Sequence, residues 1–286
     1  MNSLIACAIQ MVSGPDVASN LSHAARLIAS AAAAGAQLIV LPEYFAIMGQ
    51  SDRDKLAHQE PYQEPCQADH QADHQADYQA APLQHFLATQ AREHQIWLVG
   101  GTIPLVSGQP DKVMNSCLAY NPAGECVARY DKIHLFGFAN GSECFAEADT
   151  ICAGQQPVAF DTPFGRIGLA VCYDLRFPEL FRSMDTVGEV DIWVLPAAFT
   201  ATTGRAHWEV LLRARAIENQ CFVVASGQGG VHPSGRATFG HSMLIDPWGV
   251  VLDVLPEGEG LALAELKATQ LHRVRTILPA LKHRVF

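Results

Sequence analysis

The sequence predicts an α/β protein built from two β-sheets, each covered by helices on one face. Short apolar and β-branched runs alternate with amphipathic stretches along nearly all of the 286 residues. The predicted strands outnumber the predicted helices by about two to one, which is too many for one parallel sheet with helices on both faces. No shift in composition marks a domain boundary, so we expect a single domain over residues 1–286 with a polar insert at about 51–81.

Hydrophobic periodicity and turn residues define the elements in order. The run "LIACAIQM" at 4–11 predicts a strand, and the amphipathic stretch at 17–36 predicts a helix that Gly35 ends. The other elements predicted in the first half are strands at 37–43, 96–104, 113–122 and 126–133, and a helix at 83–95. In the second half, apolar runs predict strands at 166–172, 191–199, 221–228, 240–247 and 261–266, with helices between the first three.

Residues 51–81 interrupt this alternation with a polar, low-complexity segment. Within it, "QADHQADHQADYQA" repeats one tetrad three times, and a period of four places His70, His74 and Tyr78 on one face of a helix. Two histidines at this spacing can bind zinc or nickel, but no third ligand accompanies the pair. We therefore expect a solvated loop or short helix here, and no metal site.

The composition argues against several classes of protein. A net charge of −10 without any Lys/Arg-rich run argues against nucleic-acid binding. No apolar run reaches the length of a membrane span, and the N-terminus lacks the basic region and cleavage site of a signal peptide. The eight cysteines are scattered and form no C-x-x-C pair, so we expect a reduced, cytoplasmic protein.

Three of the predicted strands end on ionisable residues of different kinds. The apolar run at 166–171 is followed at once by Cys172, and two other strands deliver Glu43 and Lys132. Buried cysteines are usually inert, and most glutamates and lysines are solvated surface residues. In α/β proteins, however, ligands bind at the carboxyl ends of strands, so we expect these three side chains to converge on one pocket.

A thiol, a carboxylate and an ammonium together support amide hydrolysis through a covalent acyl-enzyme. Glu43 can take the proton of Cys172 as the sulfur attacks a carbonyl carbon, and can return it to the leaving amine. Lys132 and the backbone N–H of Tyr173 can stabilise the oxyanion that forms. This chemistry requires neither a metal nor a cofactor. The residues alone leave open a non-catalytic binding or redox protein with a reactive thiol.

The stretches "LPEYF", "RYDKIHLF" and "GLAVCYDLRFPEL" resemble the signatures of the nitrilase, or carbon–nitrogen hydrolase, superfamily, and the resemblance covers nearly the whole chain apart from the insert. It implies a four-layer α-β-β-α sandwich. It also implies a catalytic triad with Glu43 as general base and acid, Lys132 as oxyanion stabiliser and Cys172 as nucleophile. The family carries a second, supporting glutamate, which "CFAEADT" identifies as Glu147, although Glu143 is nearby.

Within the superfamily, "AHWEVLLRARAIENQCFVVASGQGG" and "GHSMLIDPWG" are most similar to the branch of deaminated glutathione amidases. This similarity implies hydrolysis of deaminated glutathione to 2-oxoglutarate and cysteinylglycine, a metabolite-repair reaction. The alternative is an ω-amidase that acts on 2-oxoglutaramate or 2-oxosuccinamate. The polar insert departs from the pattern of the branch and leaves the shape of the pocket rim, and with it the choice of substrate, open.

Four residues near the predicted strand ends are candidates for substrate binding: Tyr173, Arg176, Phe199 and Thr200. Arg176 precedes Pro178, which suits the first turn of a helix, so its guanidinium is expected close to the pocket. A guanidinium can hold a substrate carboxylate at two points. The alternative is a surface arginine that pairs with Glu179 or Asp174.

The resemblance also implies a homodimer or larger homo-oligomer that forms through the helices after the nucleophile. The segment "FPELFRSM" is consistent with this, because it carries more apolar residues than one sheet face can bury: Phe177, Leu180, Phe181 and Met184. The expected partner is therefore a second copy of the chain, and the expected ligand is a small amide that carries a carboxylate. We expect no nucleic-acid or membrane partner.

Overall fold

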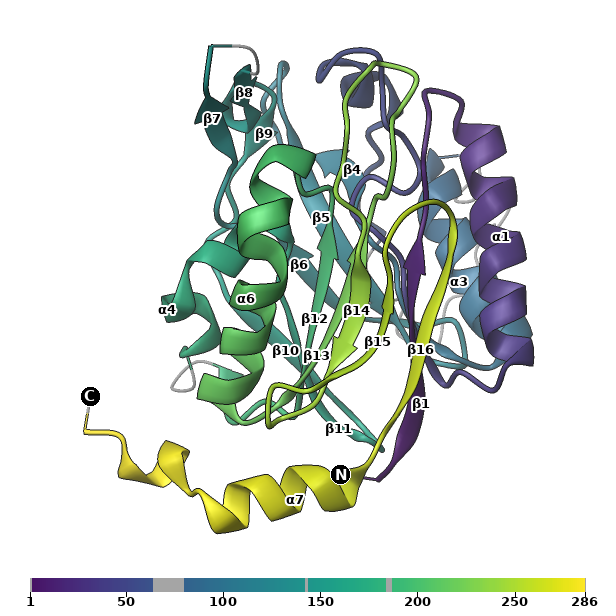
Figure 1. The fold of residues 1–286 in the computed structure, drawn as a ribbon. Coiled ribbons are helices and arrows are strands. Elements are labelled where there is room, and N and C mark those ends of the chain that lie inside the picture. The colour runs from purple at the N-terminus through teal and green to yellow at the C-terminus, as the bar shows by residue number, and fades with distance from the viewer. Residues whose placement is uncertain (1, 64–79, 142–143, 184–186, 286) are drawn as a thin grey trace.

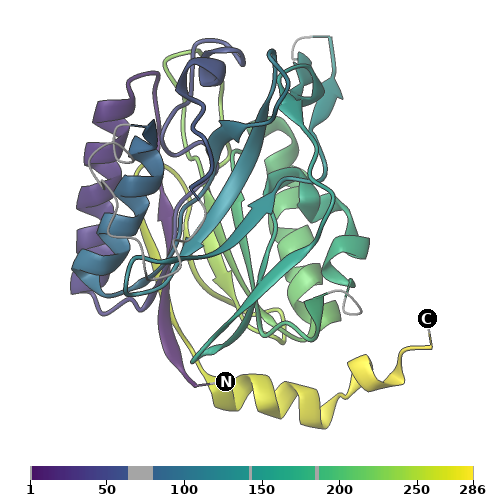
Figure 2. The same ribbon diagram turned by 180° about the vertical axis from the view of Figure 1, so that it is seen from behind.

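Two β-sheets lie face to face between two layers of helices (Figures 1 and 2). The structure is a computed structural model, and it describes residues 2–63, 80–141, 144–183 and 187–285. The tetrad repeat with His70, His74 and Tyr78 lies outside the described residues, and so does Glu143.

The first sheet contains strands from the first half of the chain and one from its end. These strands are β1 (Leu4–Gln10), β2 (Leu38–Val40), β3 (Trp97–Val99), β4 (Ile103–Val106), β5 (Val113–Tyr120), β6 (Cys126–Asp131), β9 (Ile151–Cys152) and β16 (Gly260–Leu266). Their order is β16-β1-β2-β3-β5-β4, and β6 and β9 also pair with β5. Strands β1, β2 and β3 run parallel. Helices α1 (Val17–Ala33) and α3 (Pro82–His94) cover the outer face of this sheet (Figure 1).

The second sheet is formed by the second half of the chain. Its strands are β10 (Val158–Thr162), β11 (Gly165–Leu169), β12 (Ile192–Ala197), β13 (Phe222–Gly227), β14 (Ser242–Ile245) and β15 (Val251–Leu255), and they lie in chain order. Because β11, β12 and β13 run parallel, their carboxyl ends meet at one edge of the sheet. Helices α4 (Pro178–Phe181) and α6 (Ala201–Asn219) cover the outer face (Figure 2).

The remaining elements lie at the ends of the sandwich. They are a hairpin of β7 (Gly137–Ala139) and β8 (Cys144–Ala146), the helix α7 (Ala268–Ile277), and the 3₁₀ turns η1 (Asp54–His58), η2 (Glu147–Asp149), η3 (Cys172–Arg176) and η4 (Ala280–His283). None of the helices in the described part of the chain combines the length and the apolar composition that a membrane span requires.

Strand β1 shows how the sequence specifies four layers. Its residues Leu4, Ala6 and Ala8 are buried in the core between the two sheets. The intervening residues Cys7 and Ile9 are buried in a separate core under α1 and α3. Successive side chains of a strand point to opposite faces, so a strand that is apolar throughout must be covered on both sides. The α-β-β-α sandwich that the resemblance implied is confirmed.

The predicted strand at 96–104 is wrong in one respect, because the chain forms two strands that are separated at Gly100 and Gly101. Gly101 has a φ of 55°, and an added Cβ would lie 2.1 Å from the carbonyl oxygen of Pro42. Only glycine fits this left-handed position against another backbone. The break matters for function because Pro42 immediately precedes Glu43.

Three further expectations need correction. The strand before Cys172 ends at Leu169, and the predicted helix in "FPELFRSM" has a single turn, α4. Its residues Leu180 and Phe181 are only 5% and 3% exposed, so their own chain already buries the apolar face that was expected to seek a partner. The strands β7 to β10 and β15 and the helix α7 were not predicted, because they are short or largely polar at the surface.

Candidate active site

Glu43 follows β2 and lies between the two sheets. Its side chain is 1% exposed. One carboxylate oxygen, Oε1, accepts hydrogen bonds from Nζ of Lys132 and Nδ2 of Asn115, each at 2.9 Å. The other, Oε2, accepts the backbone N–H of Ala198 at 2.9 Å. These contacts connect both sheets, because Asn115 belongs to β5 and Ala198 follows β12, so the carboxylate is held in one position.

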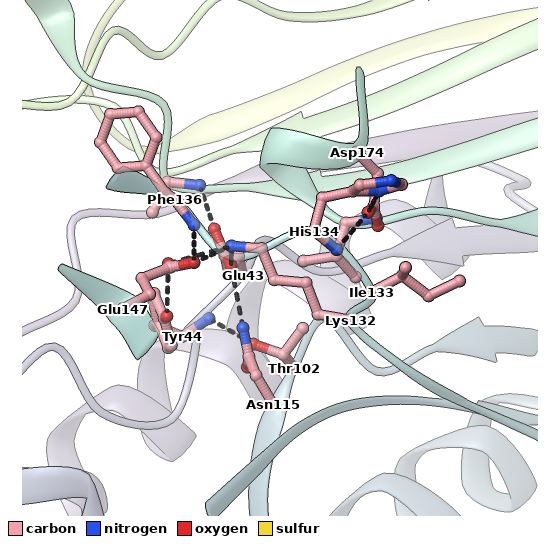
Figure 3. A network of polar contacts seen from close by, with 12 residues as sticks. Glu43, Tyr44, Thr102, Asn115, Lys132, Ile133, His134, Phe136, Glu147 and Asp174 are labelled. Carbon is pink, nitrogen blue, oxygen red and sulfur yellow. Dashed lines mark hydrogen bonds and ion pairs between the residues drawn. The ribbon is translucent and has the colours of Figure 1, made fainter. Parts of the chain in front are cut away.

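Lys132 follows β6 and is fully buried between two carboxylates. Its Nζ lies 2.9 Å from Oε1 of Glu43, and 2.9 and 2.7 Å from Oε1 and Oε2 of Glu147 (Figure 3). Burial alone would lower the pKa of the ammonium, but attraction from Glu147 and then Glu43 outweighs it and raises the pKa. Lys132 is therefore a fixed positive charge.

Glu147 begins η2 and supports the lysine from the other side. Its Oε1 accepts the hydroxyl of Tyr44 at 3.0 Å, and its Oε2 accepts the backbone N–H of Phe136 at 2.7 Å (Figure 3). Burial would raise the pKa of this carboxyl, but the charge and hydrogen bonds of Lys132 lower it. Glu147 thus occupies the position expected of the supporting glutamate.

Cys172 begins η3, three residues after the end of β11. Its φ of 47° lies in the left-handed region, which is strained for a residue with a side chain and is frequent at active sites. The side chain is 7% exposed. Burial, followed by repulsion from Glu43, raises the pKa of the thiol well above its usual value, and attraction from Lys132 lowers it less. The resting thiol is therefore protonated and requires a base.

Asp174 holds the loop of the nucleophile, a role that the sequence did not reveal. Its Oδ2 accepts the backbone N–H of Val171 at 2.8 Å and the hydroxyl of Tyr130 at 2.7 Å. Its Oδ1 accepts the backbone N–H of His134 at 3.1 Å and lies 2.7 Å from Nδ1 of that ring (Figure 3). Asp174 thereby joins the turn at Cys172 to the segment that follows Lys132, and it is not paired with Arg176 as the sequence allowed.

Cys172 lines a small cavity of about 10 Å³. Its described lining comprises Phe136, Glu147, Cys172, Ala198, Phe199, Thr200, Thr203 and Arg236. Two of the predicted substrate-binding residues, Phe199 and Thr200, therefore border the cavity. Arg236 was missed, because it lies in a loop whose composition, "VHPSGRATFG", contains no pattern that separates a site residue from a surface arginine.

Tyr173 and Arg176 lie one layer behind this lining. The ring of Tyr173 packs edge-on against Phe136, with ring centroids 5.1 Å apart. The guanidinium carbon of Arg176 lies 5.1 Å from the centroid of Phe199, and its Nη1 lies 3.1 Å from Nδ1 of His207. Both residues thus touch the lining of the cavity from behind.

Within the described residues, no three His, Cys, Asp or Glu side chains form a group that would hold a metal ion.

Glu43, Lys132 and Glu147 form one hydrogen-bonded network, and the thiol of Cys172 lies within electrostatic reach of all three charges. Glu43 has the chemistry of a base toward a nearby thiol, and Lys132 has the charge needed to stabilise an oxyanion. The fold therefore brings together the side chains of Glu43, Lys132 and Cys172, which are far apart in the sequence. They meet between the sheets, at the strand ends where the ionisable residues were expected.

Comparisons with known proteins identify the family of the chain. The family model described as "Carbon-nitrogen hydrolase" matches residues 5–276. A "Deaminated glutathione amidase" of Synechocystis is 42% identical over 100% of both chains. An "Omega-amidase, chloroplastic" of Arabidopsis thaliana is 34% identical over 93% of this chain and 68% of its own. A solved structure from Saccharomyces cerevisiae, titled as a member of branch 10 of the nitrilase superfamily, is 30% identical with a TM-score of 0.83, covering 100% of this chain and 97% of its own. The chain belongs to the carbon-nitrogen hydrolase family and is a hydrolase that acts on carbon–nitrogen bonds.

Proposed function

We propose that Cys172, Glu43 and Lys132 hydrolyse a small amide through a thioester. The observation that carries this proposal is the contact of one fully buried ammonium, Lys132, with both Glu43 and Glu147 beside the thiol. A buried charge network of this kind adds little to stability because of its desolvation cost, and such networks are concentrated at functional sites. The catalytic unit in this proposal is one domain over residues 1–286, with residues 51–81 as an insert.

The reaction begins when Glu43 takes the thiol proton as the sulfur of Cys172 bonds to the carbonyl carbon. Lys132 and the backbone N–H of Tyr173 stabilise the resulting oxyanion. Its collapse breaks the carbon–nitrogen bond, and the protonated Glu43 gives its proton to the leaving amine. Glu43 then deprotonates a water that attacks the thioester, the carbon–sulfur bond breaks, and the proton returns to the thiol. The supporting role of Glu147 is to hold Lys132 in place.

The proposed substrate is deaminated glutathione, which yields 2-oxoglutarate and cysteinylglycine. Its support is the identity of 42% with a relative of that name over the full chain. The second candidate is an ω-amidase activity on 2-oxoglutaramate or 2-oxosuccinamate. Its support is the similarity to the Arabidopsis protein, whose identity of 34% is lower. The two activities differ in the leaving group, which is a dipeptide amine in the first and ammonia in the second.

Parallel assays of free cysteinylglycine and of ammonia distinguish these functions. We expect kcat/KM for deaminated glutathione to exceed that for 2-oxoglutaramate. A higher value for 2-oxoglutaramate would identify an ω-amidase, and comparable turnover of simple aliphatic amides would identify a general amidase.

The proposed location is the cytoplasm, since the cysteines that the structure describes are all free thiols, as in a reducing compartment.

Arg176 is proposed to bind the carboxylate of the 2-oxo acid portion. Its guanidinium packs on Phe199, a residue that lines the cavity at Cys172. Arg176→Lys keeps the charge but loses the planar two-point contact, which should cost about 2–4 kcal/mol of transition-state binding. We expect kcat/KM to fall roughly thirtyfold to several hundredfold for both 2-oxo acid amides. Unchanged kinetics would place the carboxylate elsewhere, with Arg205 and His207 as the next candidates.

A homodimer is proposed to form through the outer face of α6. Val210 and Ile217 on this helix are 62% and 49% exposed, and Trp248 nearby is 51% exposed. Such a patch favours association with a second copy. Light scattering at micromolar concentration should give a dimer or larger assembly, and Val210→Glu with Ile217→Glu should shift it to the monomer. The matched control Val106→Glu changes a valine on β4 that is 49% exposed, and it should leave the mass unchanged. A monomeric parent protein would refute the assembly.

A further inference from the structure

A second, larger cavity adjoins the one at Cys172. Its volume is about 270 Å³, and its lining includes Tyr44, Met48, Asp52, Lys55, Phe145 and Arg236. The two cavities meet at Arg236, which lines both. Tyr44 links them further, since its hydroxyl donates to Glu147 at 3.0 Å. The proposed function does not use this larger cavity.

Arg236 presents part of its guanidinium without a partner. Its Nη2 donates to the carbonyl oxygen of Ala198 at 3.1 Å, and its guanidinium carbon lies 5.0 Å from the ring centroid of Phe145. Its Nε is buried and has no hydrogen-bond partner within the described residues. A buried donor of this kind costs stability unless a ligand accepts from it.

Lys55 is a second cation in the wall of the larger cavity. The residue is 8% exposed, and its Nζ lies 5.1 Å from the ring centroid of Tyr44. Its polar contacts are long, with Oγ1 of Thr150 at 3.4 Å and a carboxylate oxygen of Asp52 at 4.0 Å. Burial lowers the pKa of the ammonium more than the nearby carboxylates raise it. An anion bound close to Nζ would compensate the cost of burying this charge.

The charges around the two cavities favour an anionic ligand. The buried carboxylates Glu43 and Glu147 are both bound to Lys132. Among the described residues that line the larger cavity, Arg236 and Lys55 are accompanied by one carboxylate, Asp52, whose side chain is 50% exposed. The excess of positive charge therefore lies away from the thiol, on the side of the larger cavity.

We propose that Arg236 and Lys55 bind the carboxylate of the leaving group, at the glycine end of the dipeptide. This inference rests on the proposed function, in which the substrate carries one carboxylate on the acyl part and another on the leaving part. An extended dipeptide spans about 7 Å, so a leaving group of this length must extend well beyond the carbonyl carbon that Cys172 attacks. The larger cavity is the adjoining space, and it is lined by the two cations. The subsite would thus select peptide amides over ammonia-releasing amides.

The test uses Lys55→Met, which keeps the length of a buried side chain and removes its charge. We compare deaminated glutathione with 2-oxoglutaramate, which has no leaving-group carboxylate. The ratio of their kcat/KM values should fall about tenfold to a hundredfold, as expected for one lost charge-assisted hydrogen bond. The control Lys112→Met changes a lysine that donates to the carbonyl oxygen of Ala148 at the surface, and it should keep the ratio. An unchanged ratio in Lys55→Met would overturn the subsite.

A substrate variant provides the second half of the test. Deaminated glutathione whose glycine ends in an amide should lose a similar factor in the parent enzyme, and Lys55→Met should then cost little more. Equal losses for acid and amide in Lys55→Met would overturn the contact.

Failure of the proposed function is recognised separately, because a parent enzyme that releases no cysteinylglycine refutes the substrate directly. In that case the affinities of the Cys172→Ala protein for cysteinylglycine and for its amide decide the question. A preference for the acid that disappears in Lys55→Met supports the subsite, and equal affinities overturn it.

Discussion

Replacing Cys172 with alanine should lower amide hydrolysis by a factor on the order of 10⁴ or more, to the limit of detection. Without the sulfur no thioester can form, although Glu43 and Lys132 stay in place. Two measurements check this expectation, the release of product and the intact mass of acid-quenched enzyme. The parent protein should gain the mass of one acyl group during turnover, and the variant should not.

Cys152→Ala is the matched control for this substitution. Cys152 is a partly buried free thiol on β9 and is absent from the described lining of the cavity at Cys172. Its replacement should leave both turnover and acyl-enzyme formation nearly unchanged. If Cys172→Ala kept more than about a tenth of the parent rate, the nucleophile would have to be another group.

The environment of Cys172 also bears on the alternative of a redox protein. Redox-active cysteines are usually exposed thiols with a lowered pKa. Burial and the neighbouring Glu43 instead raise the pKa of Cys172, which keeps the resting thiol protonated. A thiol in this state reacts only when a base removes its proton during attack. The burial of Cys172, which is only 7% exposed, therefore favours an acyl-transfer enzyme over a redox sensor.

Much of the fold followed from local patterns in the sequence. Alternate residues of β1 are buried in two separate hydrophobic cores, as expected for an apolar strand that is covered on both faces. Glu43, Lys132 and Cys172 were expected to converge because each follows an apolar strand, and the network of hydrogen bonds brings Glu43 and Lys132 within 2.9 Å. Short-range periodicity was sufficient here because strand ends in such folds meet at one edge.

Other features depend on contacts that local patterns do not encode. Arg215 on α6 is only 5% exposed, because its guanidinium donates to the carbonyl oxygen of Leu175 at 2.9 and 3.1 Å. Asp174 likewise is bound to partners 40 and 44 residues earlier in the chain. Neither contact has a spacing that a sequence pattern could reveal. The partners become neighbours only after the sheets have packed.

Lys132→Met should cost both activity and stability. The methionine has nearly the same length, but the oxyanion loses its charge, so kcat/KM should fall on the order of 10³-fold. Two buried carboxylates, Glu43 and Glu147, also lose their shared cation, which should lower the free energy of unfolding by about 3–5 kcal/mol. Adding Glu147→Gln removes one of the unpaired carboxylates. The double variant should therefore regain stability in a denaturant titration without regaining activity.

The dependence of stability on pH should change in the single variant. In the parent protein, Lys132 lowers the pKa of Glu147, so this pair contributes stability at pH values above the usual glutamate pKa and loses it as the pH falls through the lowered value. In Lys132→Met we expect burial to raise the pKa of Glu147 above its value in the unfolded chain. Stability should then increase as the pH falls from 7.5 to 5.0, by up to about 1.4 kcal/mol per pH unit for one proton. Urea unfolding of both proteins at the two pH values measures this slope. A variant whose stability does not increase on acidification over this range would show that Lys132 is not the charge that keeps Glu147 ionised.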